Sequence, residues 1–305
     1  MAGDPLSDGV TNSVVIWSKT DRSATMEVEY GTRADLQQSV KRKGPEASPE
    51  AGYTARVELT GLKPGAEYFY RVTFAEGTAR SEPFTGRFRT PAAGKSVRLL
   101  WSGDTCGQGY GINPDWGGMR IYEAMRQREP DFFIHSGDTI YADNAIPREI
   151  VLKDGSIWRN VVTEAKSHAA KTLDDFRGAH EYNFLDANLR RFHAEVPQVW
   201  QWDDHEFRNN WSPGNVEGSA PARQAFREFA PMRMRPGVDR IYRKISYGPL
   251  LEVFVIDMRS YRAANNFNRQ EKEGPETTYL GAAQMQWLGQ ALAASRAKWK
   301  LVASD

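Results

Sequence analysis

The sequence VRLLWSGD (97–104) is the first of four apolar runs that each finish in aspartate; the others are DFFIHSGD (131–138), QVWQWDD (198–204) and LLEVFVID (250–257). Short apolar runs that alternate with helical patterns are typical of buried strands in a layered α/β domain. The carboxyl ends of strands in an open α/β sheet converge on the ligand crevice, so we expect these aspartates to share one site. Converging carboxylates repel one another unless a cation neutralises them, which predicts a metal site.

Amphipathic patterns between and after these runs predict four helices, at 116–129, 172 to about 192, 222–229 and 282–296. The second helix begins with Thr172 and has Asp175 three residues later, which is a capping-box pattern. In the fourth, Met285, Leu288 and Leu292 recur at helical spacing. This spacing predicts a face that packs on the core.

The N-terminal part has a different pattern, with short β-rich runs from residue 12 to about residue 90. The runs are SVVIWS, TMEVEYGT, YTARVELT, AEYFYRVTF and GRFRT. Turn residues separate them, which predicts a β-sandwich, and the segment 59–72 resembles the tyrosine-corner region of fibronectin type III modules. We expect a surface loop at 41–50 and a linker at 90–96, and therefore a sandwich domain at 1–92 followed by an α/β domain at 93–305.

Composition excludes several classes of protein. The chain has 305 residues, 40 lysines and arginines against 39 aspartates and glutamates, and a net charge of +1. A nearly neutral chain has no general field that would hold nucleic acid or an anionic membrane. No run approaches the 18 or so apolar residues of a transmembrane helix, and the given N-terminus has no signal-peptide pattern.

Two residues stand out by their neighbours. Cys106, which is the single cysteine, lies in GDTCGQG, where flanking glycines let the backbone approach a ligand closely. His205 lies in WDDHEFRNN, between acidic and amide side chains, and we assign it a functional role. By contrast, we expect His135 to be a core histidine, and the remaining histidines, His168, His180 and His193, to be structural or solvated.

These motifs together carry a family resemblance. GDTCGQG (103–109), HSGDTIY (135–141), WDDHEFRNN (202–210) and IDMRSYR (256–262) occur in this order, and GDPLSDGVTNSVVIWSK (3–19) precedes them. The set resembles the PhoD-like alkaline phosphatases of the calcineurin-like metallophosphoesterase superfamily along the whole chain. The resemblance implies a fibronectin type III-like sandwich, an α/β metallophosphoesterase domain, and hydrolysis of phosphate monoesters or diesters at a centre of Fe3+ and Ca2+.

The resemblance also implies the roles of the site residues. Asp138 would bridge the metals, and Tyr141 and Cys106 would be anionic ligands of ferric iron. Asp104 is a further candidate ligand at a position where the family commonly has a smaller or uncharged residue. For calcium, carboxylate and amide oxygens are suited, so Asp204 and Asn210 are the candidate ligands, with Asn209 as a close competitor.

For catalysis, His205 would protonate or stabilise the leaving alkoxide, with Glu206 or Asp203 orienting its ring. Arg262, and with it Arg259, offers donors for phosphate oxygens, although a buried ion pair is an equal alternative for these arginines. The implied partner is a small phosphate ester, and the implied location is periplasmic or extracellular.

Further ligands of the family, an Asp and one or more His residues, are expected beyond residue 305, so the domain is expected to be C-terminally incomplete. Two alternatives stay open. One is a hydrolase like the purple acid phosphatases, against which DDHE and Cys106 argue. The other is a catalytically inactive module that binds a surface polymer.

Overall fold

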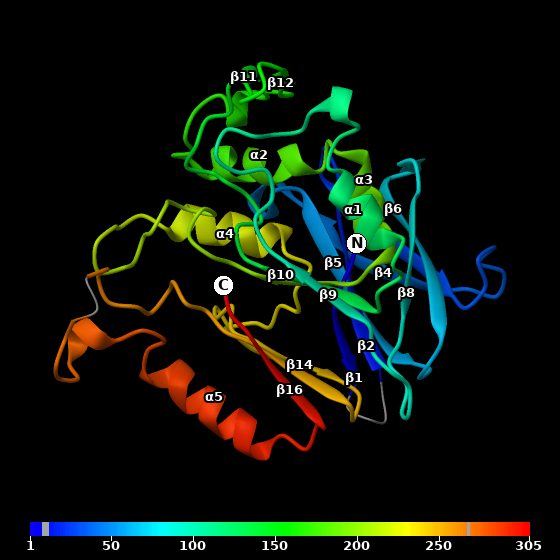
Figure 1. The fold of residues 1–305 in the computed structure, drawn as a ribbon. Helices are drawn as coiled ribbons and strands as arrows, with labels where there is room; N and C mark the ends of the chain where they lie inside the picture. The colour runs from blue at the N-terminus through cyan, green and yellow to red at the C-terminus, as the bar shows by residue number, and fades with distance from the viewer. Residues whose placement is uncertain (8–11, 267–268) are drawn as a thin grey trace.

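The computed structural model describes residues 1–7, 12–266 and 269–305, and its main element there is a mixed nine-stranded sheet (Figure 1). The order along the sheet is β16-β15-β14-β1-β13-β10-β9, and β2 and β5 continue it from β1. The strands are β1 (Ala2–Ser7), β2 (Asn12–Lys19), β5 (Thr54–Leu62), β9 (Leu99–Ser102), β10 (Phe132–Ser136), β13 (Gln198–Gln201), β14 (Arg243–Tyr247), β15 (Leu251–Val255) and β16 (Trp299–Ala303). Residues 8–11 of the N-terminal motif lie outside the described residues.

The expected β-sandwich is confirmed. A second sheet has the order β4-β3-β6-β7, with β8 on β6, and consists of β3 (Ala24–Gly31), β4 (Val40–Ala47), β6 (Glu67–Glu76), β7 (Ala79–Arg80) and β8 (Phe84–Arg89). Buried and half-buried residues alternate along β3 and β6, and the buried ones share a core with β2 and β5. The Tyr68 hydroxyl accepts a hydrogen bond from the Lys63 N–H at 2.9 Å, as a tyrosine corner does with nearby backbone.

The surface loop expected at 41–50 is wrong, because most of it is strand β4, paired antiparallel with β3. Seven of its eight side chains are exposed or half-buried. Edge strands commonly carry such charged, exposed residues, which discourage pairing with other chains. A strand without a buried face therefore lacks the apolar alternation that predicts strands.

Strand β1 connects the sandwich with the central sheet. It pairs antiparallel with β2 and makes single residue pairs with β13 and β14. Asp4 in this strand is fully buried and accepts hydrogen bonds from the Arg243 guanidinium, the shortest at 2.7 Å, and from the Arg233 N–H at 2.9 Å. A buried carboxylate needs such partners, so this ion pair fixes the two regions against each other.

The apolar runs quoted first are strands, as predicted. β9, β10 and β13 pair in parallel, with Phe132 opposite Leu99 and Phe133 opposite Gln198. β14 and β15 are antiparallel, and β15 and β16 are parallel. Phe132, Val199 and Val253 contribute to one buried cluster between these strands.

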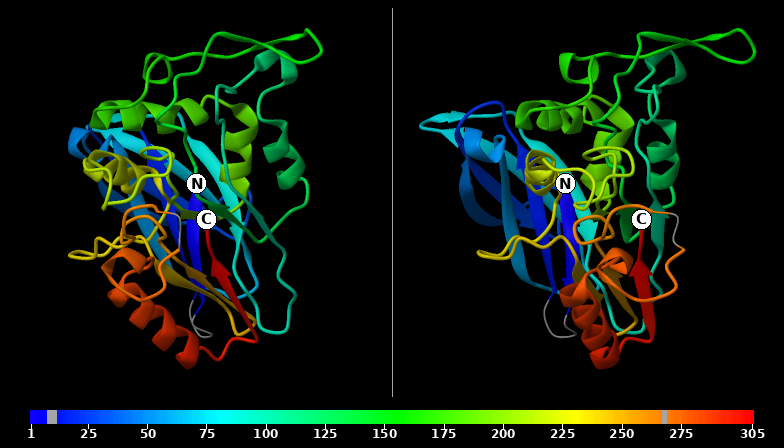
Figure 2. Two further views of the ribbon diagram at one scale, coloured as in Figure 1. Left: turned by 60° about the vertical axis from the view of Figure 1, so that its left-hand side comes forward. Right: turned by 90° about the vertical axis from the view of Figure 1, so that its left-hand side faces the viewer.

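Helices α1 (Arg120–Arg126), α2 (Leu173–Asn183), α3 (Ala187–Glu195) and α4 (Ala220–Phe229) lie on one side of the sheet (Figures 1 and 2). Helix α5 (Ala282–Ala294) lies apart from them, beside β14 and β16. Short 3-10 turns, η1 (Pro49–Ala51), η2 (Pro114–Trp116), η3 (Glu164–Lys166) and η4 (Pro275–Thr277), and a hairpin of β11 (Glu149–Val151) and β12 (Ile157–Arg159) complete the elements. Among the described residues, no helix is long and apolar enough to span a membrane.

Two helix predictions need correction. The helix expected at 116–129 is shorter, because Gly117 and Gly118 adopt left-handed φ angles of 76° and 72° between η2 and α1. The helix expected from 172 to about 192 is two helices. The capping box of Thr172 is present at the start of α2, but a new helix begins after Asp186, whose side chain accepts the Leu189 N–H at 2.9 Å.

The apolar face expected on α5 is also wrong for Met285, which is 56% exposed, while Leu288 and Leu292 are half-buried. The buried side chain of this helix is Gln284. Its amide accepts the Asp257 N–H at 2.7 Å and donates to the Asp257 carbonyl at 2.8 Å. Polar contacts with the end of β15 thus determine which side of α5 faces the sheet.

Candidate metal centre

Two carboxylates and a histidine come together beyond the ends of β10 and β13. Asp138, Asp204 and His205 are buried, and each offers a ligand atom within 4.8 Å of the others. The backbone N–H of His205 donates to Asp138 Oδ1 at 3.1 Å, which joins the two strand ends directly. The expectation that aspartates at strand ends share a site is therefore met for β10 and β13.

This group carries more buried negative charge than its surroundings neutralise. Burial, followed by the nearby Glu206 and Asp203 carboxylates, raises the pKa of Asp138 from its ordinary 3.8 to about 8. Burial likewise raises the pKa of Glu206 to about 7, against the hydrogen bonds that lower it. Because a bound cation would reverse the repulsion that raises the Asp138 pKa, this donor set fits a metal site.

Glu206 organises the backbone beneath the group and does not orient the His205 ring. Its carboxylate accepts the Thr139 N–H at 2.6 Å, the Thr139 hydroxyl at 2.7 Å and the Asp203 N–H at 2.8 Å. Asp203 pairs instead with Arg259, at 2.5 Å. The expectation that one of these two acids orients His205 is wrong, because both are held by nearer donors.

The residue that does orient His205 is Asp143, which the sequence reading missed. His205 Nδ1 lies 2.8 Å from Asp143 Oδ1, and Asp143 Oδ2 accepts the Asn209 N–H at 2.6 Å. Burial alone would lower the pKa of His205, but Asp143 and the nearby Asp138 outweigh it and raise that pKa to about 9. The available signal was position, since Asp143 follows Tyr141 by two residues.

Tyr141 links this group to the loop after β9. Its ring stacks on His205 with centroids 4.1 Å apart, and its hydroxyl donates to Asp104 Oδ1. Burial and the hydrogen bond to Asp104 both raise the pKa of Tyr141. The Tyr141 ring therefore lies beside His205 and its hydroxyl beside Asp104, and the roles of Tyr141 and Asp104 as ligands stay predictions.

Cys106 and Asn210 occupy less direct positions. Cys106 packs against a small apolar cluster that includes Ile112 and Tyr182, and burial raises the pKa of its thiol to about 12. Asn210 approaches Asp204 through its backbone N–H, which donates to Asp204 Oδ2. Within the described residues, neither Cys106 nor Asp104 belongs to the group that lies within 4.8 Å of Asp138.

The two arginines behave differently. Arg259 is half-buried, forms an ion pair with Asp203 and lies 3.8 Å from Asp204, so the ion pair of the structural alternative is present. The Arg262 guanidinium lies 4.6 Å from the centre of the Tyr279 ring. Among the described residues, it makes no ion pair with the acidic group, so its role in phosphate binding stays a prediction.

A buried lysine supports the loop that carries Tyr141 and Asp143. Lys166 is only 3% exposed, and its ammonium group donates to the Tyr141 carbonyl and, at 3.5 Å, to the Asn144 carbonyl. Burial lowers its pKa to about 8. Nothing in the local sequence identifies this lysine, because its partners are backbone atoms more than twenty residues away.

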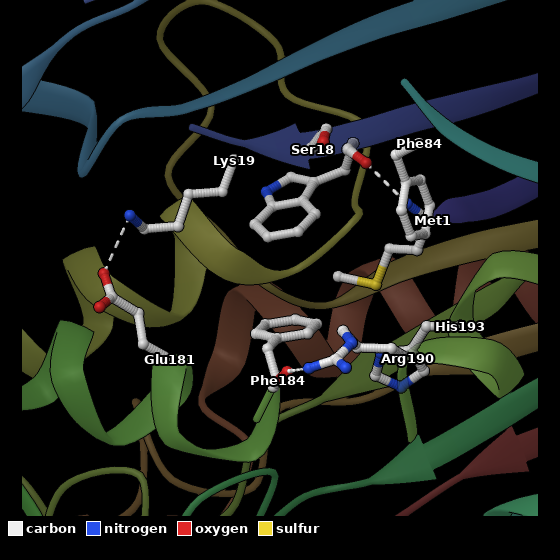
Figure 3. A pocket seen from close by; sticks show the side chains of 9 residues that line it. Met1, Ser18, Lys19, Phe84, Glu181, Phe184, Arg190 and His193 are labelled. Atoms are coloured by element: carbon white, nitrogen blue, oxygen red, sulfur yellow. Dashed lines mark hydrogen bonds and ion pairs between the residues drawn. The ribbon is translucent and has the colours of Figure 1, made fainter. Parts of the chain in front are cut away.

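A separate cavity of about 270 Å³ lies between the sandwich and helices α2 and α3 (Figure 3). Its charged groups already have partners. Lys19 pairs with Glu181 at 3.0 Å, and Arg190 donates to the Phe184 carbonyl at 2.6 Å. We interpret this cavity as a packing gap at the junction of the two regions, distinct from the acidic group.

Comparison with known proteins gives consistent matches along the chain. The family model of the PhoD-like phosphatase N-terminal domain matches residues 1–92, and that of the PhoD-like phosphatase matches residues 99–305. Alkaline phosphatase D of Bacillus subtilis (strain 168) is 33% identical over 336 residues, which cover 100% of this chain and 54% of that protein. The chain thus spans about half the length of this relative.

Solved structures give the same picture. A structure of PhoD superposes with a TM-score of 0.78 at 30% identity, covering 99% of this chain and 60% of that one. The purple acid phosphatase PPD1 from yellow lupin (Lupinus luteus) seeds gives a TM-score of 0.55 at 16% identity, covering 99% of this chain and 50% of that one. The second match shows a shared fold.

Proposed function

This chain belongs to the PhoD-like phosphatase family, and from that premise we propose that it hydrolyses phosphate esters at a metal centre built on Asp138 and Asp204, with His205 beside it as a proton donor. The observation that carries the proposal is that these three side chains are buried and that one possible ligand atom of each lies within 4.8 Å of the others. Buried carboxylates without sufficient counter-charge are costly unless they bind a cation.

The proposed centre contains Fe3+ and Ca2+. Asp138 would bridge the two, Asp104, Cys106 and Tyr141 would complete the iron side, and Asp204 with Asn210 would hold calcium. The donor types support this division, because phenolate and thiolate suit ferric iron, whereas carboxylate and amide oxygens suit calcium. When bound, the metals supply Lewis acidity, which lowers the pKa of a coordinated water and neutralises charge on the phosphoryl group.

The protein residues would move two protons. Tyr141 would have to release its phenolic proton to solvent to become a ligand, because Asp104, whose Oδ1 accepts the hydrogen bond from the Tyr141 hydroxyl, is itself a proposed ligand. His205, whose Nδ1 lies 2.8 Å from Asp143 Oδ1, would donate a proton to the leaving alkoxide, and the hydrogen bond to Asp143 favours its protonated form. Arg262, whose guanidinium lies 4.6 Å from the centre of the Tyr279 ring, is proposed to bind phosphate oxygens.

A location outside the cytoplasm also belongs to this proposal and rests on the family resemblance. The alternative of an inactive polymer-binding module is tested by the same experiments as catalysis. The purple acid phosphatase alternative is less favoured, because that relative shares the fold at only 16% identity.

The primary test is hydrolysis of p-nitrophenyl phosphate and bis-p-nitrophenyl phosphate before and after removal of metals with a chelator. We expect activity that is lost on chelation and returns with iron and calcium together. If the protein retains these metals but hydrolyses neither ester, the inactive-module alternative replaces the proposal.

The identity of iron has a spectroscopic test. Phenolate or thiolate bound to Fe3+ gives a visible charge-transfer band, which calcium and zinc do not. We expect the Tyr141→Phe variant to shift or bleach this band. An unchanged spectrum would remove Tyr141 from the ligand set.

The role of His205 is tested by a series of esters whose leaving alcohols differ in pKa. His205→Ala should lower turnover most for poor leaving groups and least for nitrophenyl esters, which leave unaided. An equal loss throughout the series would assign His205 to metal binding instead.

A further inference from the structure

Three aromatic rings cluster on the surface beside the loop that follows β9. The rings of Tyr110 and Trp158 meet edge to face with centroids 5.8 Å apart, and those of Trp116 and Trp158 lie 5.6 Å apart. Tyr110 is 44% exposed and Trp116 is 54% exposed, while Trp158 is half-buried. Exposed large aromatic side chains that gather in one place are a recognised feature of binding sites.

The rings come from segments that are held together. Trp158 lies in β12 of the β11–β12 hairpin, which projects from the body of the molecule beside η2, the turn that carries Trp116 (Figures 1 and 2). Arg159 of the hairpin lies 3.6 Å from Asp115 of η2.

Asn160 joins the loop that carries Tyr110 to the hairpin. Its amide donates to the Gly109 carbonyl at 2.8 Å and accepts the Gly111 N–H and the Trp158 indole N–H, each at 2.8 Å. The loop that carries Tyr110 is therefore bonded on both sides of this residue to the hairpin. These contacts hold the three rings in place relative to one another.

This surface begins one turn away from the proposed catalytic centre. The Tyr110 N–H donates to the Gly107 carbonyl at 3.1 Å, and such a turn places the two Cα atoms within about 7 Å. Gly107 itself lies against Tyr141, since a Cβ added there would come within 2.4 Å of the Tyr141 ring. A ligand group a few bonds from a phosphate at the centre is thus within reach of the rings.

The chemistry of the surface favours a flat ring as its ligand. The Trp158 indole N–H bonds to Asn160, and Arg159 pairs with Asp115 and with Glu149 at 3.3 Å, so these polar groups beside the rings already have partners. Sites that recognise hydroxyl-rich sugars need polar groups directed at the hydroxyls, whereas stacking needs only ring faces. The cluster offers the ring faces.

We propose that Tyr110, Trp116 and Trp158 form a subsite that stacks on the planar ring, aryl or nucleobase, of the alcohol part of a phosphate ester. The proposal rests on the proposed function for the position of the phosphate. It deepens that function by assigning a substrate class, namely esters that carry a flat ring a few bonds from phosphorus.

The test compares two ligands that differ only in the ring. Adenosine 5′-monophosphate and ribose 5-phosphate share the same primary phosphate ester, and calorimetric titration measures their binding without requiring turnover. We expect the nucleotide to bind the metal-loaded protein more tightly, and Trp116→Ala to lower its affinity about fivefold to a hundredfold while ribose 5-phosphate is unaffected. Trp116→Phe, which keeps a ring, should restore most of the difference.

Trp299→Ala is the matched control, because Trp299 is 63% exposed and lies in β16, outside the cluster. Equal affinities for the two ligands, or a nucleotide preference that survives Trp116→Ala, would overturn the subsite. So would glucose 6-phosphate binding as tightly as the nucleotide. Nucleotide binding that depends on Trp116 in a protein that hydrolyses no ester would support the subsite and refute the proposed function alone.

Discussion

The core of the sandwich and the acidic group beyond β10 and β13 are buried to the same degree but have opposite chemistry. Val28, Tyr70 and Val72 are 1% exposed and pack with apolar neighbours. Asp138 and Asp204 are 6% and 5% exposed, beside further carboxylates. Burial stabilises the first region through the hydrophobic effect and destabilises the second through desolvation of charge. The acidic group therefore exists for a reason other than folding.

The backbone differs in the same way. Strands β3 and β6 form a regular antiparallel ladder over seven residue pairs. Around the acidic group, four non-glycine residues have φ between 51° and 60°: Asp104, Cys106, Asp138 and Asn210. Non-glycine residues seldom adopt this region, and such residues collect at functional sites. The core strands β3 and β6 contain no such residue, although loops of the sandwich do, at Leu36, Gln38 and Tyr53, so the contrast holds between the sandwich core and the loops of the acidic group.

The largest expected effect comes from Asp138→Asn, which should change activity and stability in opposite directions. Loss of this proposed ligand carboxylate should lower the proposed phosphate-ester hydrolysis by about a thousandfold or more. The folded-state pKa of Asp138, about 8, is above its ordinary 3.8, so folding takes up a proton and stability falls as pH rises from about 4 to 8. Without metal at pH 9, the variant should therefore unfold at a higher temperature than the wild type.

Asparagine keeps the size of the side chain and an oxygen that can accept the hydrogen bond from the His205 backbone N–H, so the substitution is conservative. Kinetic assays and calorimetric unfolding at pH 9 in the presence of a chelator measure the two effects. A variant that is both inactive and less stable would show that Asp138 is a structural residue.

Phe88→Ala in the sandwich should have the reverse pattern. Phe88 is 2% exposed and its ring stacks on Tyr68 with centroids 5.4 Å apart, so the cavity should lower the free energy of unfolding by about 3–5 kcal/mol. Urea unfolding measures this loss. Hydrolysis per folded molecule should stay unchanged, and a large fall in kcat would mean that the two regions are not energetically separate.

The smallest expected effect concerns His180, a buried histidine in helix α2. Burial lowers the pKa of His180 from 6.5 to about 3, so the unfolded chain binds a proton below pH 6.5 that the folded protein does not. Stability is therefore lost as pH falls from about 6.5 towards 3, at about 1.4 kcal/mol per pH unit for this group. His180→Phe, which preserves stacking on Phe229, should reduce the loss between pH 6.5 and 5.5 by about 1 kcal/mol, because the unfolded histidine is only half protonated at pH 6.5.

Urea unfolding at the two pH values measures the slope, and His168→Gln is the control because His168 is exposed. An unchanged slope in His180→Phe would show that His180 does not contribute to the acid sensitivity. A slope that His168→Gln reduces as strongly would assign the effect to the surface.

Much of the fold could be predicted from the sequence, because the spacing of apolar residues and the composition of each segment indicate which side chains are buried. The strand patterns of the sandwich, the four apolar runs and the capping box at Thr172 all appear in the structure. The edge strand β4 could not be predicted, because its exposed charged residues carry no alternation. The face of α5 was wrong because hydrogen bonds of Gln284 outweigh the burial of Met285.

The site was predictable where its residues end strands and less so where they act through space. Asp138, Asp204 and His205 follow β10 and β13 and do come together. Asp143 was missed because its partner His205 is 62 positions away. The roles of Cys106, Asn210 and Arg262 stay predictions, since ligand geometry depends on loops whose positions no local pattern encodes.

The central claim is that the buried acidic group is a metal centre, and the metal content of the purified protein tests it most directly. Elemental analysis by inductively coupled plasma mass spectrometry, after extensive dialysis, would compare the wild type with Asp138→Asn. We predict iron and calcium in the wild-type protein and a marked loss of both in the variant, with the Phe88→Ala protein retaining wild-type amounts. Equal metal content in the wild type and Asp138→Asn, or no bound metal in either, would contradict the account.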